Sequence, residues 1–224
     1  MVVLYKADAR RGDSWLRFFA THAPEIEFRI WPKTGDPDSV RFLALWEPVD
    51  GLKEQFPNLE VLFSTGAGAD QFDLAAIPDS VQVVRLVDPA ITAGMREYVS
   101  FAVIALHRDM LQYQDSQHQR LWQPLHGKAS SDTCVGVMGL GSLGQAVLGV
   151  LQPYGYSLRA WSRSPHDIDG VDCFAGKEQL RDFAARADIL VCLLPLTPET
   201  RGILNRDLFN AMPRGASLVN VGRG

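Results

Sequence analysis

A glycine-rich loop between an apolar run and a helical pattern constrains this 224-residue chain more than any other stretch. The run Cys134–Met138 is apolar and includes two valines, which is typical of a buried strand. Gly139, Gly141 and Gly144 follow it in the pattern G-x-G-x-x-G. Apolar residues then recur at helical spacing until Pro153 ends the helix. We interpret the stretch as the strand, turn and helix of a dinucleotide-binding unit.

Each glycine of the loop has a physical role in this interpretation. Gly139 permits the tight turn, Gly141 lets the backbone approach a pyrophosphate, and Gly144 lets helix and strand pack closely. The N–H groups at the helix start, around Ser142 and Leu143, face the anion, with the helix dipole behind them. The alternative is a glycine-rich turn without a ligand, but the position between strand and helix favours the binding loop.

The composition excludes several other classes of protein. A net charge of −4 without a Lys/Arg-rich cluster gives no reason to expect a nucleic-acid partner. No apolar run reaches the ~18 residues of a membrane span, and the N-terminal residues lack a signal-peptide layout. Cys134, Cys173 and Cys192 lie far apart, which favours reduced thiols in a cytoplasmic protein. The histidines lack metal-ligand spacing, so we expect no metal site.

Strand-like runs alternate with helical patterns along the whole chain, which predicts an α/β protein with parallel sheets and helices on both faces. A long helix is expected from Thr92 to about Gln117, and we place a domain boundary near residue 98. The expected domains are therefore 1–98 and 99–224, the second containing the glycine loop. Strand patterns lie at 2–5, 27–31, 42–46, 59–63, 81–87, 134–138, 157–161, 188–194 and 217–221.

The end of the second strand of the dinucleotide unit predicts which cofactor binds. A unit that prefers NAD places Asp or Glu there to hold the ribose 2′-OH. This chain has Ser162, Arg163 and Ser164 instead. A guanidinium binds a 2′-phosphate bidentately and serine hydroxyls can donate to it, so we expect NADP(H), with NAD(H) as a second cofactor. The alternative is that Arg163 is only a solvated surface charge.

Four stretches of the chain resemble the D-isomer-specific 2-hydroxyacid dehydrogenase family, and most closely its glyoxylate/hydroxypyruvate reductase A branch. They are G-A-G-A-D at 66–70, M-R-E-Y-V at 95–99, the glycine loop, and L-P-L-T-P-E-T at 194–200, which leads through M-P-R-G-A at 212–216 to N-V-G-R-G at 220–224. The resemblance implies two doubly wound parallel-sheet domains. The first would be a flavodoxin-like substrate domain and the second a Rossmann dinucleotide-binding domain, truncated at its C-terminus.

The resemblance also assigns roles to individual residues. It implies that the backbone at Ala67 and Gly68 holds the substrate carboxylate, and that Arg223 binds the carboxylate and keto oxygen of a 2-oxo acid. The planar guanidinium fork suits that substrate and stabilises the alkoxide that forms during reduction. Trp46 would line the substrate pocket, although an ordinary core tryptophan is the open alternative. The turn from Leu194 to Thr200, which includes Pro195, would lie beside the nicotinamide ribose, and Val221 and Gly222 are expected to contact the cofactor.

The family further uses a Glu and a His located after the arginine, and no residue of this sequence occupies those positions. We therefore expect the sequence to be the first part of a longer polypeptide, and a chain ending at Gly224 to be inactive. The resemblance also implies a homodimer formed through residues 92–130. Two functions remain open: an NADPH-dependent reductase of small 2-oxo acids such as glyoxylate and hydroxypyruvate, or a corepressor-type sensor of NAD(P)H without turnover. Retention of Arg223 favours the enzyme, because a sensor needs no keto-acid clamp.

Overall fold

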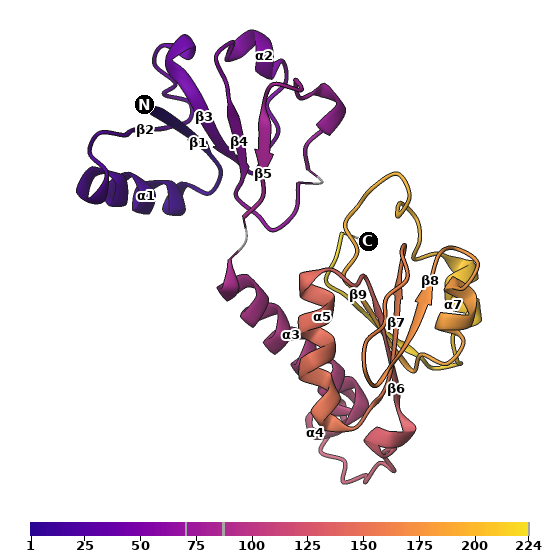
Figure 1. Ribbon diagram of the computed structural model, residues 1–224. Helices are drawn as coiled ribbons and strands as arrows, with labels where there is room; N and C mark the ends of the chain where they lie inside the picture. The colour runs from indigo at the N-terminus through magenta and orange to yellow at the C-terminus, as the bar shows by residue number, and fades with distance from the viewer. Residues whose placement is uncertain (70, 87, 224) are drawn as a thin grey trace. The chain divides into compact units, whose positions relative to one another are not determined.

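The computed structural model describes residues 1–69, 71–86 and 88–223, which form the compact units Met1–Asp88 and Pro89–Gly224 (Figure 1). The predicted boundary near residue 98 is wrong, because helix α3 (Pro89–His107) belongs entirely to the second unit. Val99 and Val103 of α3 are fully buried in the core of that unit. Because these valines anchor α3 in that core, the beginning of the helix also belongs to the second unit.

The first unit is a doubly wound sheet in the order β2-β1-β3-β4-β5, whose neighbouring strands run parallel. This is the flavodoxin-like order, so the fold expected from the resemblance is confirmed. The elements are β1 (Val2–Lys6), α1 (Ala9–His22), β2 (Glu27–Ile30), β3 (Val40–Leu45), α2 (Leu52–Gln55), β4 (Val61–Ser64) and β5 (Gln82–Val84).

Both faces of this sheet are buried at its centre, which explains why β1 and β4 are apolar along most of their length instead of alternating. On one face Leu4 packs in a cluster with Leu43 and Leu62. On the other face Tyr5 packs with Phe28 and with Trp15 of α1. Successive residues of β1 therefore serve two different cores. We therefore expect the functional residues of this unit on the loops that follow its strands.

The second unit is a parallel sheet in the order β10-β9-β6-β7-β8. The chain runs outward from β6 to β8, returns to the other side of β6 at β9, and continues to β10. The Rossmann order is therefore confirmed, with its switch point between β6 and β9. The elements are β6 (Cys134–Met138), α5 (Ser142–Leu151), β7 (Ser157–Ser162), β8 (Val171–Ala175), α6 (Leu180–Ala184), β9 (Ile189–Cys192), α7 (Arg206–Ala211) and β10 (Ser217–Asn220).

The long helix expected from Thr92 to Gln117 is two helices. α3 ends at His107 and α4 (Met110–His118) begins after Asp109, whose φ of 53° lies in the left-handed region. α3 packs beside α5, as Figure 1 shows, and shares a core cluster with it. Within the described ranges, no helix combines the length and apolarity needed to cross a membrane.

The three cysteines lie on strands of the second unit. Cys134 and Cys192 are buried and Cys173 is half-buried, and all three are free thiols. Burial raises the pKa of each thiol. The reactive thiolate is therefore disfavoured, as expected of cysteines with a packing role.

Candidate functional site

The glycine loop joins β6 to α5 through a turn that only glycine fits at two positions. Gly139 has a φ of +100°, a conformation that strains any other residue, and its N–H donates to the Trp161 carbonyl at 2.8 Å. A β-carbon at Gly144 would overlap the Gly139 carbonyl oxygen. The close packing that Gly144 allows is thus between the first turn of α5 and the loop itself.

The start of α5 is open toward a ligand. Gly141 is its N-cap residue, and no described side chain caps the helix. A β-carbon at Gly141 would meet no atom within 4 Å. Ser142 is exposed and Leu143 half-buried in the first turn. An uncapped helix N-terminus beside free space provides N–H donors for an anion, so these residues fit the pyrophosphate of a dinucleotide.

The loops that follow β6, β9 and β10 meet at the carboxyl edge of the sheet, beside the switch point. The Leu194 side chain lies 3.3 Å from the position of a β-carbon on Gly139, and a β-carbon on Gly222 would overlap the Leu194 carbonyl oxygen. The Arg223 N–H donates to that same oxygen at 3.3 Å, and the Val221 N–H donates to Cys192 at 3.0 Å. The structure therefore brings together Gly139, Leu194, Val221, Gly222 and the exposed Arg223.

The turn after Leu194 is held in shape by Thr200. Its hydroxyl donates to the Pro195 carbonyl at 2.6 Å and accepts the Thr197 N–H at 2.8 Å. The Thr200 N–H in turn donates to the Thr197 carbonyl at 3.2 Å. These hydrogen bonds join both ends of the turn through Thr200. Thr200 therefore fixes the backbone conformation of the loop after β9, at the carboxyl edge of the sheet.

At the end of β7, Ser162 does not face outward as its place in the sequence suggested. It is 7% exposed, and its hydroxyl donates to the Ser164 carbonyl at 2.6 Å. The His166 Nδ1 atom lies 3.0 Å from the same hydroxyl. Ser162 therefore shapes the turn, and its proton is not directed at a 2′-phosphate. Arg163 and Ser164 are exposed and remain the groups for that contact.

A second cation accompanies Arg163. The pKa of Glu199, on the loop after β9, is lowered first by a hydrogen bond with Thr197 and further by the charges of Arg163 and Lys177. Arg163 and Lys177 therefore each lie within electrostatic reach of Glu199. Sequence reasoning missed Lys177, since it follows β8, a strand that was not expected.

The first unit places the remaining predicted residues at the carboxyl ends of β3 and β4. Trp46 is 42% exposed, so the alternative of an ordinary core tryptophan is wrong. Its ring lies against Gly66, where a β-carbon would overlap it. Ala67 is exposed and Gly68 half-buried on the loop after Gly66. Asp70, the last residue of the G-A-G-A-D stretch, lies outside the described residues.

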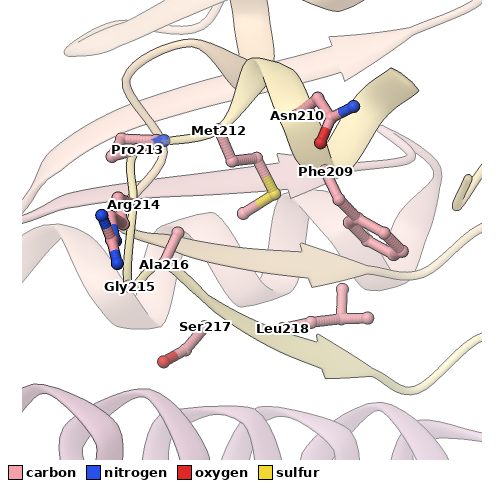
Figure 2. A pocket seen from close by; sticks show the side chains of 9 residues that line it. All are labelled: Phe209, Asn210, Met212, Pro213, Arg214, Gly215, Ala216, Ser217 and Leu218. Atoms are coloured by element: carbon pink, nitrogen blue, oxygen red, sulfur yellow. The ribbon is translucent and has the colours of Figure 1, made fainter. Parts of the chain in front are cut away.

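Two cavities lie at the other edge of the second sheet. One of about 420 Å³ is formed by the end of α7 and the start of β10, where Figure 2 shows Phe209 and Met212 near Leu218. A neighbouring cavity of about 540 Å³ includes His107 and Asp188. Both lie at the amino ends of strands. Because dinucleotides bind at the carboxyl ends, neither cavity belongs to the nucleotide site.

His107 and His166 make hydrogen bonds within the second unit. His107 is bonded to the Tyr156 hydroxyl and the Lys128 carbonyl, each at 2.9 Å, and His166 to the turn after β7. Within the part of the chain that the structure describes, no group of three His, Cys, Asp or Glu side chains is placed to hold a metal ion.

The doubly wound second unit, its switch point and its glycine loop define a dinucleotide-binding α/β protein. Residues 100–224 match the sequence profile of the D-isomer specific 2-hydroxyacid dehydrogenase, NAD binding domain. The chain therefore belongs to the D-isomer-specific 2-hydroxyacid dehydrogenase family and is an oxidoreductase, which confirms the resemblance seen in its motifs.

Individual relatives support this assignment along the chain. A Glyoxylate/hydroxypyruvate reductase A from Yersinia enterocolitica is 36% identical over 216 residues, covering 94% of this chain and 69% of the relative. A D-isomer specific 2-hydroxyacid dehydrogenase from Xanthobacter autotrophicus Py2, solved with NADPH and MES, is 36% identical with a TM-score of 0.89, covering 100% of this chain and 72% of that one. An NADPH-dependent glyoxylate/hydroxypyruvate reductase from Sinorhizobium meliloti, solved with NADP and sulfate, is 33% identical with a TM-score of 0.87, at 100% and 73% coverage.

Proposed function

We propose that this protein reduces small 2-oxo acids, such as glyoxylate and hydroxypyruvate, to 2-hydroxy acids with NADPH. The observation that carries the proposal is the meeting of the β6, β9 and β10 loops at the carboxyl edge, with Arg223 directly after Gly222. In this proposal the first unit supplies the substrate-binding groups Ala67, Gly68 and Trp46, and the second unit supplies the dinucleotide site. The names of the relatives support the same substrates.

The chemistry assigns distinct tasks to the residues of this chain. When bound, the dinucleotide supplies the hydride that reaches the keto carbon. The N–H groups at the start of α5 and the glycine loop hold its pyrophosphate. The Arg223 guanidinium binds the substrate carboxylate and stabilises the negative charge that forms on the keto oxygen. The backbone at Ala67 and Gly68 orients the carboxylate, and a general acid then protonates the alkoxide.

The direct test is the loss of NADPH absorbance with a panel of 2-oxo acids, using the protein expressed from its complete gene. We expect turnover of glyoxylate or hydroxypyruvate. If NADPH binds but every 2-oxo acid of the panel is left unreduced, the reductase proposal is wrong and the sensor function takes its place.

Cofactor choice gives the first prediction. Arg163 and Ser164 are exposed at the end of β7, Lys177 adds positive charge, and no acidic residue stands at the end of that strand. We expect NADPH to bind at least about tenfold more tightly than NADH, and Arg163→Ala to remove most of that preference. Fluorescence titration with both cofactors measures it. Arg181→Ala, which removes an exposed charge from α6, is the control and should keep the preference. Equal dissociation constants in the wild type would contradict NADP selectivity.

Assembly gives the second prediction. Large apolar side chains are exposed along α3, α4 and the segment after them, namely Tyr98, Phe101, Met110, Leu111, Tyr113, Leu121 and Trp122. Exposed apolar patches of this kind mark protein contacts, and we propose that two copies of the chain cover them around a two-fold axis. Light scattering at micromolar concentration should give the mass of a dimer. A monomeric wild type would contradict the proposal.

The dimer is tested further by placing a charge in the proposed interface. Phe101 is 72% exposed, and Phe101→Asp should give monomers because the new carboxylate would be buried without a partner. The control Phe18→Asp changes an exposed phenylalanine of α1 and should leave the mass unaltered.

We also propose the cytoplasm as the compartment of this protein, because its cysteines are free thiols with raised pKa values.

A further inference from the structure

The loop at the carboxyl end of β4 is organised by one buried hydroxyl that the sequence did not single out. Ser64 is 3% exposed. Its oxygen accepts the Gly66 N–H at 3.2 Å and the Gln71 side-chain amide at 2.9 Å. Its proton is donated to the Gly68 carbonyl at 2.5 Å. One donor and two acceptor sites exhaust the capacity of a hydroxyl, so Ser64 is fully used by this loop.

Three carbonyls of the loop accept hydrogen bonds from other elements. Arg11 of α1 donates from Nη1 to the Thr65 carbonyl at 3.0 Å. The Leu86 N–H, in the segment after β5, donates to the Gly66 carbonyl at 3.1 Å. The Gly68 carbonyl is held by Ser64, as described above. Three attachments, from α1, the segment after β5 and the last residue of β4, therefore restrain the orientation of the peptide planes between Thr65 and Ala69.

This arrangement sets the direction of the Ala67 N–H. In a trans peptide the N–H points opposite to the carbonyl. Since the Gly66 carbonyl is directed at Leu86, the Ala67 N–H points away from it, and it has no hydrogen-bond partner among the described residues. An N–H that is held in one direction and has no partner among the described residues can donate to an acceptor from outside the chain.

The loop also leaves polar atoms unpaired in its interior. Thr65 Oγ1 and Gln71 Oε1 are buried without a hydrogen-bond partner among the described residues. Leaving such atoms unpaired costs free energy, so the conformation is not the one that satisfies the most polar groups. Backbone arrangements of this kind persist at ligand sites, where the surroundings impose them.

We propose that the Ser64 hydroxyl and the Arg11 guanidinium are positioning groups, which hold the Thr65–Ala69 peptides so that the Ala67 N–H meets the carboxylate of the substrate. Neither group touches the substrate in this proposal. Both act through the loop backbone. The inference rests on the proposed function, because it concerns the carboxylate of the same 2-oxo acid.

The test compares Ser64→Ala and Arg11→Gln with the wild type, using the protein expressed from its complete gene. We expect KM for glyoxylate and the inhibition constant of oxalate, a planar carboxylate analogue, to rise about tenfold in each variant, since a misdirected N–H loses one hydrogen bond to the carboxylate. The dissociation constant of NADPH should not change. Ser64→Thr, which keeps the hydroxyl, should restore KM toward the wild-type value.

Two matched controls separate positioning from general destabilisation. Ser39→Ala removes a hydroxyl that bonds Asp36 and Arg29 before β3, and Arg10→Gln removes the charge next to Arg11 on the same helix. Both should keep the wild-type KM. Arg11 is exposed, so its variant tests the proposal even if Ser64→Ala fails to fold. An active enzyme in which Arg11→Gln and the folded Ser64 variant keep KM overturns this inference alone. A wild type that reduces no 2-oxo acid overturns the proposed function and this inference with it.

Discussion

Gly144→Ala is expected to lower NADPH affinity by at least about a hundredfold, ~2.7 kcal/mol, and to lower the free energy of unfolding by about 3 kcal/mol. The new methyl group would overlap the Gly139 carbonyl oxygen, and that oxygen belongs to the backbone, which cannot rotate away as a side chain would. To make room, the first turn of α5 must separate from the glycine loop. The N–H donors around Ser142 and Leu143 then no longer converge on one anion.

The chain offers a matched control on the same helix. Gly149 also lies in α5, and a β-carbon there would meet no atom within 4 Å. Gly149→Ala should therefore stabilise the protein by about 0.5–1 kcal/mol, because alanine favours the helix, and should leave NADPH affinity unaltered. Urea denaturation and fluorescence titration measure the two quantities. Wild-type affinity in Gly144→Ala would show that the close contact is not needed for binding.

The sequence predicts the Rossmann unit well because its two signals agree. The apolar run of β6 and the helical spacing of α5 surround the glycine loop, and the structure shows Gly139 at a φ of +100°, which other residues rarely adopt, and Gly144 with no room for a β-carbon. The same consistency fails at β8. Its sequence, VDCFA, includes Asp172 and is half-buried along most of its length, so it lacks the continuous apolar character of the central strands.

Other differences arise where tertiary contacts decide what the local sequence leaves open. Asp109 takes a left-handed φ of 53° and divides one continuous helical pattern into α3 and α4. No glycine or proline marks that break. The domain boundary was misplaced because the sequence does not show which unit buries Val99 and Val103.

In the candidate site, the sequence predicts which residues take part but not the directions of their side chains. Motif residues such as Gly139 and Arg223 are found from spacing and resemblance. The direction of a hydroxyl is not encoded in spacing, so Ser162 was expected to face a phosphate although it bonds the Ser164 carbonyl. For the same reason Ser64 looks like the last residue of an ordinary strand, and only its hydrogen bonds reveal that it organises the loop after β4.

Arg223→Ala is expected to lower kcat/KM for glyoxylate or hydroxypyruvate by at least about a hundredfold, ~3 kcal/mol of transition-state stabilisation. The Arg223 N–H is bonded to the Leu194 carbonyl, so the residue is attached to the β9 loop that borders the switch point. Its guanidinium offers two parallel donors to a planar carboxylate and positive charge to the alkoxide. Arg223→Lys keeps the charge without the fork and should fall between the alanine variant and the wild type.

The control for this variant is an arginine at the opposite end of the same strand. Arg214 is exposed before β10, at the amino edge where the cavity of Figure 2 lies, and Arg214→Ala should keep wild-type kinetics. Steady-state assays with NADPH, together with NADPH titration of each variant, separate catalysis from cofactor binding. If Arg223→Ala binds NADPH and reduces 2-oxo acids at the wild-type rate, the charge at the end of β10 does not act on the substrate. Dinucleotide binding would then be the property that this edge of the sheet serves, as in a sensor without turnover.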